Sequence, residues 1–84
     1  MSETVTAVVR VLAQALSLRD GAAGFNRDTP LLGSIPELDS MAVVNVITGL
    51  EDAFGFTVAD DDVDAHTFAT VGTLSDFVDR KLGG

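Results

Sequence analysis

The sequence predicts an all-α fold, a single domain over residues 1–84 arranged as a four-helix bundle. We expect three main helices, a short third helix and a long loop between the first two. Apolar residues recur at helical spacing in three separate stretches. Hydrophobic residues make up 46% of the chain but all five aromatic residues are Phe, which indicates a mainly aliphatic core. Only residues 54–58, Phe-Gly-Phe-Thr-Val, favour β structure.

The first helix is predicted over about residues 3–18. Its apolar side chains fall at i, i+3, i+4, i+7 and i+11, the stripe of an amphipathic helix, and Ser2 or Thr4 can cap its start. The stripe consists of Val5, Val8, Val9, Leu12 and Leu16.

Residues 19–39 lose this periodicity and contain Gly21, Gly24, Pro30, Gly33 and Pro36, which predicts a loop. A loop of this length in so small a domain should be functional or anchored to the core. The candidate anchors are Phe25, Leu31, Leu32, Ile35 and Leu38.

The second helix is predicted to begin at Asp39 and Ser40 and to end near Phe54, before Gly55. Gly49 costs about 1 kcal/mol relative to Ala within a helix, so we interpret it as a point of close helix contact. The predicted buried stripe is Val43, Ile47, Leu50 and Phe54.

Two further helices are expected. The short third helix should start in the cluster 60–62, whose carboxylates suit a helix N-terminus, and include Val63. The last helix should open at residues 73–76, Thr-Leu-Ser-Asp, which resembles a capping box. Arg80 and Lys81 then suit its final turn. Its predicted buried residues are Leu74, Phe77, Val78 and Leu82.

The charge pattern restricts the possible partners. Thirteen acidic and five basic residues give a net charge of −8, and residues 28–79 contain eleven acids and no Lys or Arg. Such a surface repels nucleic acid and anionic membranes and favours basic protein partners. With no Cys, no signal-peptide pattern and no long apolar run, the sequence predicts a cytoplasmic protein without a membrane span. We expect a monomer.

The sequence does not favour an enzyme. Ser40 could act as a nucleophile only with a base beside it, and the single histidine, His66, lies in an unrelated segment. We therefore interpret His66 as structural. Asp60, Asp62 and Asp64 have the spacing of the first ligands of a calcium loop. The sixth and twelfth positions of that loop hold Ala65 and Val71 in place of Gly and Glu, so an acidic helix cap fits better and no metal site is expected.

Ser40 has two interpretations. An Asp-Ser pair before a helix is usually a cap that accepts hydrogen bonds from free backbone N–H groups. However, a serine in the first turn also lies at the positive end of the helix dipole, where an attached phosphodiester would be stabilised. Ser40 additionally follows the long loop and precedes an apolar residue, Met41, that we expect to be exposed.

Several motifs resemble the acyl carrier protein and peptidyl carrier protein family. Leu-Asp-Ser-Met at 38–41 is followed, at family spacing, by LEDAFGF at 50–56, an acidic stretch at 60–63 and FATVGTLSDFV at 68–78. The resemblance implies that a phosphopantetheinyl transferase attaches 4′-phosphopantetheine from coenzyme A to Ser40, and that Asp39 helps to engage this transferase. Acyl or aminoacyl groups would be carried as thioesters on the arm, whose thiol compensates for the absence of Cys.

The resemblance also implies a partner face on the second helix, formed by Met41, Val44, Asn45, Thr48, Glu51 and Asp52. Fatty acid carriers typically have acids where this chain has Ala42 and Asn45. We therefore expect Ala42 to be exposed on this face as well, and a loading ligase and acyl-using enzymes with basic or apolar docking patches. These departures favour a specialised pathway, and the motifs look like free-standing carriers of the exosortase-associated type.

Two alternatives use the same residues differently. In one, the chain is a small acidic interaction protein that binds a basic partner, and Ser40 is only a helix cap. In the other, the acidic segment near Asp60 forms a calcium-responsive module, which the incomplete calcium-loop pattern disfavours.

Overall fold

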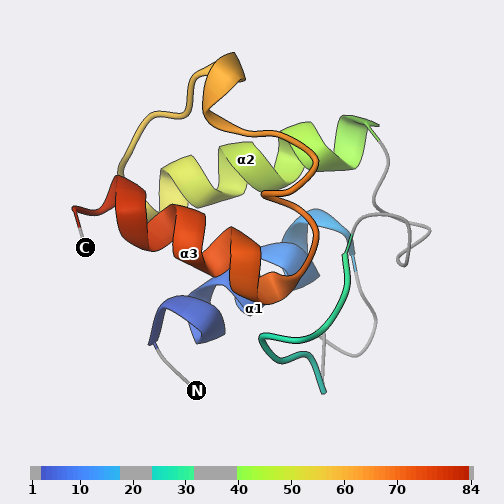
Figure 1. The fold of residues 1–84 in the computed structure, drawn as a ribbon. Helices are drawn as coiled ribbons and strands as arrows, with labels where there is room; N and C mark the ends of the chain where they lie inside the picture. The colour runs from blue at the N-terminus through green and yellow to red at the C-terminus, as the bar shows by residue number, and fades with distance from the viewer. Residues whose placement is uncertain (1–2, 18–23, 32–39, 84) are drawn as a thin grey trace.

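The computed structural model describes residues 3–17, 24–31 and 40–83. These residues form three α-helices, α1 (Glu3–Ala15), α2 (Ser40–Phe54) and α3 (Val71–Lys81), and one 3-10 turn, η1 (Asp60–Asp62). Figure 1 shows that α1 runs in the opposite direction to α2 and α3. The predicted all-α class is confirmed: the described residues contain no strand, including 54–58, and their only β-type pairing is an isolated bridge between Pro30 and Thr70. None of the described helices combines the length and apolarity needed to cross a membrane.

Helix α1 packs against both α2 and α3 and contributes a continuous apolar stripe to one core. Four of the five predicted stripe residues are buried, but Val9 is only partly buried, and Val11, which we did not predict, is buried instead. The helix ends earlier than expected, at Ala15, because Ser17 adopts a left-handed backbone with φ 54°. The buried α1 residues, with the following Leu16, are Val5, Val8, Val11, Leu12 and Leu16.

The buried stripe of α2 differs from the prediction. Ala42, Val46 and Leu50 are buried, whereas Val43, Ile47 and Phe54 are only partly buried against the edge of the core. Helix α2 is apolar around more than half of its circumference, so the spacing of its apolar residues is compatible with several buried stripes. The packing of α1 selects the one centred on Val46.

Gly49 and Gly55 have the roles expected of them. A Cβ on Gly49 would lie 2.9 Å from Cγ1 of Val11, so the glycine lets α1 and α2 approach closely. Gly55 has φ 75° and donates its N–H to the carbonyl of Glu51 at 2.8 Å, which ends α2 in a left-handed cap.

Helix α3 begins earlier than predicted. Its N-cap is Thr70, whose hydroxyl accepts a hydrogen bond from the N–H of Thr73, while the Thr73 hydroxyl accepts one from the N–H of Thr70. Thr73 is thus the third helical residue and not the cap. Leu74, Phe77 and Val78 are buried as predicted, but Leu82 is half exposed because it follows the last helical residue. Arg80 and Lys81 lie in the final turn.

The segment between α2 and α3 is less helical than predicted. It contains only the short turn η1, and Val63 has an extended backbone outside it. The Asp62 carboxylate accepts a hydrogen bond from the N–H of Ala59 at 2.8 Å, which is the capping role expected of this acidic cluster. His66 is exposed.

The described part of the first loop is anchored to the start of α3. Leu31 is buried and donates its N–H to the carbonyl of Ala69 at 2.9 Å, and Phe25 packs partly buried against the core. Arg27 and Asp76 form an ion pair at 3.0 Å. The other predicted anchors, Leu32, Ile35 and Leu38, lie outside the described residues.

Candidate functional site

The candidate site is the end of the molecule at which α2 begins. Ser40 is the first residue of α2, as the sequence predicted, while Asp39 and the side chain of Ser40 lie outside the described residues. The first four N–H groups of a helix have no partner within it and create a region of partial positive charge. The backbone at Ser40 therefore suits an attached phosphodiester, whose negative charge would be stabilised there.

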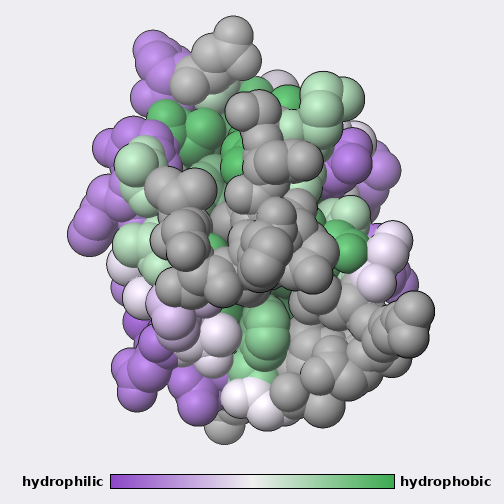
Figure 2. Space-filling view, turned by 90° about the vertical axis from the view of Figure 1, so that its right-hand side faces the viewer, coloured by the Kyte–Doolittle hydropathy of each residue, from purple (hydrophilic) through white to green (hydrophobic). Residues whose placement is uncertain are grey.

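Apolar side chains are exposed in the first turns of α2. Met41 is 69% and Val44 is 54% exposed, and Asn45 and Thr48 are also exposed. Our inclusion of Ala42 in this exposed face was wrong: Ala42 is buried in the core because it lies on the side of α2 that faces inward. Figure 2 views this end of the molecule and shows hydrophobic residues at the surface in several separate areas.

The two acids of α2 have different surroundings. Glu51 is partly buried, and its Oε2 accepts a hydrogen bond from the N–H of Val58 at 2.8 Å. Asp52 is exposed and lines a groove on the opposite edge of the helix. Glu51 thus holds the segment after α2, whereas Asp52 belongs to the accessible surface.

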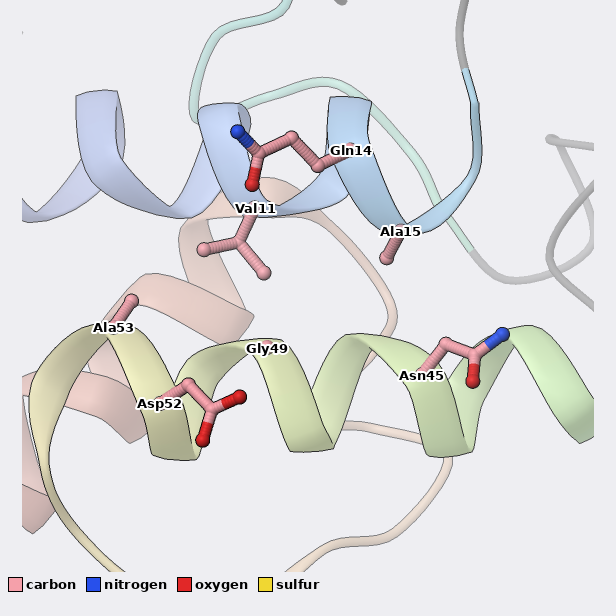
Figure 3. A pocket seen from close by; sticks show the side chains of 7 residues that line it. All are labelled: Val11, Gln14, Ala15, Asn45, Gly49, Asp52 and Ala53. Carbon is pink, nitrogen blue, oxygen red and sulfur yellow. The ribbon is translucent and has the colours of Figure 1, made fainter.

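Two hollows lined by residues that the structure describes flank α2. The larger, about 410 Å³, lies between α1 and α2 (Figure 3). The smaller, about 230 Å³, lies between Val43 of α2 and the segment that contains Val63 and Phe68, and its lining is apolar. Sequence reasoning missed the contribution of α1 to the larger groove. The signal available was the set of small residues, Ala15, Gly49 and Ala53, which allow two helices to approach.

Two carboxylates on the side of the smaller hollow have lowered pKa values. The backbone N–H of Ala59 is the main cause for Asp62, and the hydrogen bond and charge of Lys81 add to it. For Asp64 the main cause is the backbone N–H of Thr67, which donates to Oδ1 at 3.0 Å. Both acids therefore have structural partners. The residues that the structure describes contain no group of three side chains able to hold a metal ion.

Fold and site together define a small all-helical domain with a serine at the start of its second helix. The family model for the phosphopantetheine attachment site matches residues 6–78. A solution structure of a holo acyl carrier protein from Nitrosomonas europaea is similar over 99% of this chain and 100% of that one, with 47% sequence identity and a TM-score of 0.89. No curated protein matches the sequence significantly.

The chain therefore belongs to the phosphopantetheine-binding acyl carrier protein family. It is a carrier and not a catalyst: it holds acyl groups on a covalently attached 4′-phosphopantetheine arm. The thiol of this arm supplies the thioester chemistry that the cysteine-free chain lacks. Membership also implies partners of two kinds, a phosphopantetheinyl transferase and acyl-handling enzymes.

Proposed function

We propose that Ser40 is the residue that carries the arm and that the protein presents acyl or aminoacyl groups to partner enzymes. The observation that carries this proposal is the position of Ser40 at the start of α2, within the residues matched by the attachment-site family. The Ser40 hydroxyl oxygen would form the phosphodiester with the phosphopantetheine portion of coenzyme A. The nearby helix N–H groups favour its negative charge. Asp39, the preceding residue, would help to engage the transferase and its metal.

Intact-mass spectrometry tests this assignment directly. The purified apo chain is incubated with coenzyme A and a broad-specificity phosphopantetheinyl transferase. We expect the mass to increase by one phosphopantetheine group in the wild-type chain and in the control Ser34→Ala, and to stay unchanged in Ser40→Ala. Modification that persists in Ser40→Ala would place the arm elsewhere. If the wild-type chain gained no phosphopantetheine, that result would favour the acidic interaction protein in which Ser40 is only a helix cap.

We further propose that partner enzymes dock on the exposed face of α2. Its support is the exposure of Met41 and Val44 close to Ser40, bordered by the polar residues Asn45, Thr48 and Asp52. Apolar contact in the centre and charged contact at the edge are typical of a protein interface. Glu51 contributes through its charge, while its carboxylate also binds Val58.

The mixed character of this face supports a specialised role. The first turns of α2 expose Met41, Val44 and Asn45 and carry no acid, so a partner there meets an uncharged, partly apolar surface. We propose a loading ligase and acyl-using enzymes of a dedicated pathway, of the exosortase-associated type. We also propose a cytoplasmic monomer with one carrier domain over residues 1–84, in which η1 takes the place of the short third helix of a four-helix bundle.

A further inference from the structure

The chain has very few sulfur atoms, and one of them is fully accessible beside Ser40. The sequence contains no Cys, so its only sulfurs are the thioethers of Met1 and Met41. Met1 lies outside the described residues, whereas Met41 lies in the first turn of α2 with 69% of the residue exposed. A thioether this exposed is open to attack by small oxidants, which packing would exclude from a buried one.

The position of Met41 connects its chemistry to the attachment of the arm. Met41 directly follows Ser40 in α2, so an enzyme that transfers phosphopantetheine to Ser40 must cover the start of this helix and meets the Met41 side chain. Val44, three residues further along and 54% exposed, extends the same apolar surface. While the Met41 sulfur is a thioether, a partner gains hydrophobic free energy by burying this surface.

We propose that Met41 is a reversible oxidation site that controls the attachment of the arm to Ser40. A lone pair on the Met41 sulfur attacks one oxygen of hydrogen peroxide or another hydroperoxide, so that an S–O bond forms as the O–O bond breaks. The sulfur loses two electrons and becomes a sulfoxide. The second peroxide oxygen takes up the proton of the attacked hydroxyl and leaves as water or an alcohol. The inference rests on the proposed role of Ser40 and adds a means of regulating it.

The energetic effect of this oxidation appears only when a partner docks. In the free chain the sulfoxide oxygen stays hydrated, because Met41 is exposed, so the fold should be unchanged. A partner surface complementary to Met41 and Val44 is apolar and offers no hydrogen-bond donor to that oxygen. Burying a polar group without such a donor weakens binding, by about fivefold to thirtyfold for a group of this kind.

The test is the rate of arm attachment to the full-length apo chain before and after treatment with hydrogen peroxide. Catalase removes the peroxide before coenzyme A and a broad-specificity phosphopantetheinyl transferase are added, so that neither reagent is oxidised. Intact-mass spectrometry counts the oxygen atoms gained and then follows the attachment of the arm. We expect oxidation to raise the KM for the apo chain about fivefold to thirtyfold and to change kcat by less than about twofold, because it impairs docking and not the transfer step.

Two variants and a repair reaction locate the effect at Met41. Met41→Leu removes the sulfur at this position and keeps Met1, and each chain is compared with its own untreated form. Peroxide should change the KM of Met41→Leu by less than about 1.5-fold. Met41→Gln places a polar side chain of similar length there without oxidation and should raise the KM in the same direction. Methionine sulfoxide reductases A and B, which reduce the two sulfoxide epimers, should restore the original KM of the oxidised wild-type chain.

Three results would overturn the proposal. They are an equal effect of peroxide on the wild-type chain and Met41→Leu, an unchanged KM of the oxidised wild-type chain, and a loss of helical circular dichroism on oxidation. The first would place the effect at another residue, and the last would assign it to unfolding. A failure of the proposed attachment at Ser40 is distinguishable, because the untreated wild-type chain would then gain no arm. If only the oxidation inference failed, the oxidised and untreated chains would gain the arm at the same rate.

Discussion

The two sides of α2 are held to the rest of the molecule by different interactions. On one side α1 packs through apolar contact, at its tightest where Val11 meets Gly49. On the other side Phe56 stacks with Phe54 and contacts Phe77 edge-on. Beyond it, the segment 58–67 is attached by the hydrogen bond from Val58 to the Glu51 carboxylate, by the Lys81–Asp62 ion pair and by partial burial of Val58 and Val63. Within the segment, the carboxylates of Asp62 and Asp64 accept hydrogen bonds from the N–H groups of Ala59 and Thr67.

This difference indicates where the domain can open. Separating α1 from α2 would expose fully buried aliphatic residues of both helices, including Leu12 and Val46. Releasing the segment 58–67 exposes fewer buried groups, because most of its residues are exposed or partly buried already. We therefore expect local opening to begin on the side of η1 and the α1 side to open only with global unfolding.

The largest expected effect concerns the contact between α1 and α2 at Gly49. Gly49→Val would place a branched side chain where even a Cβ lies 2.9 Å from Val11, so it should lower the free energy of unfolding by about 2 kcal/mol. Urea denaturation measures this change. Ala53→Val, one turn further along α2 at an exposed position, is the control and should cost a few tenths of a kcal/mol, roughly its loss of helix propensity.

A double variant separates crowding from other causes. If the clash with Val11 is responsible, Gly49→Val combined with Val11→Ala should be more stable than the sum of the two single changes predicts, by about 1 kcal/mol. Strict additivity, or a Gly49→Val variant as stable as the unmodified chain, would mean that the helices do not approach as closely as the structure indicates.

A smaller effect on stability is expected at the neighbouring acids Glu51 and Asp52. Glu51→Ala removes a partly buried acceptor and leaves the N–H of Val58 without its bond, which should cost about 1.5 kcal/mol. Asp52→Ala should change stability by less than about 0.5 kcal/mol, since the residue is exposed and its charge near the helix C-terminus is unfavourable to the dipole. Thermal and urea unfolding measure both. Equal losses would remove the distinction between a structural and an accessible acid.

The helices were predictable from the sequence because their signals are local. The periodicity of α1, the glycine at 55 and the basic final turn of α3 each involve only neighbouring residues. The position of Ser40 at the start of α2 was predictable for the same reason. The family motifs, read together, indicated the carrier function that the comparisons support.

The errors arose where a distant segment decides. The buried stripe of α2 depends on where α1 packs, so Val46 was missed and Ala42 was placed outside. The N-cap of α3 is Thr70 and not Thr73; its capping bonds with Thr73 are local, but its backbone also pairs with Pro30 from the first loop. The groove required two helices in contact, and no single stretch of sequence could indicate Gln14 as part of its rim.

The smallest expected effect concerns the response of the segment 58–67 to a fall in pH. The folded-state pKa values of Asp62 and Asp64 lie below the ordinary 3.8, so their bonds contribute stability fully above about pH 3.8. That contribution is lost as the pH falls through the lower folded values. We expect the amides of Ala59 and Thr67 to lose hydrogen-exchange protection on acidification before the amides of α1 do.

Two variants identify the groups that make the amides of Ala59 and Thr67 lose protection first. Asp64→Asn should abolish the acid dependence at Thr67 and leave that at Ala59 intact. Lys81→Met should reduce the dependence at Ala59 without removing it, because the backbone N–H of Ala59, the largest single cause of the lowered Asp62 pKa, remains. Simultaneous loss of protection on both sides of α2 would instead show that acid unfolds the domain as one unit. The carboxylate bonds would then not define a separate region of lower stability.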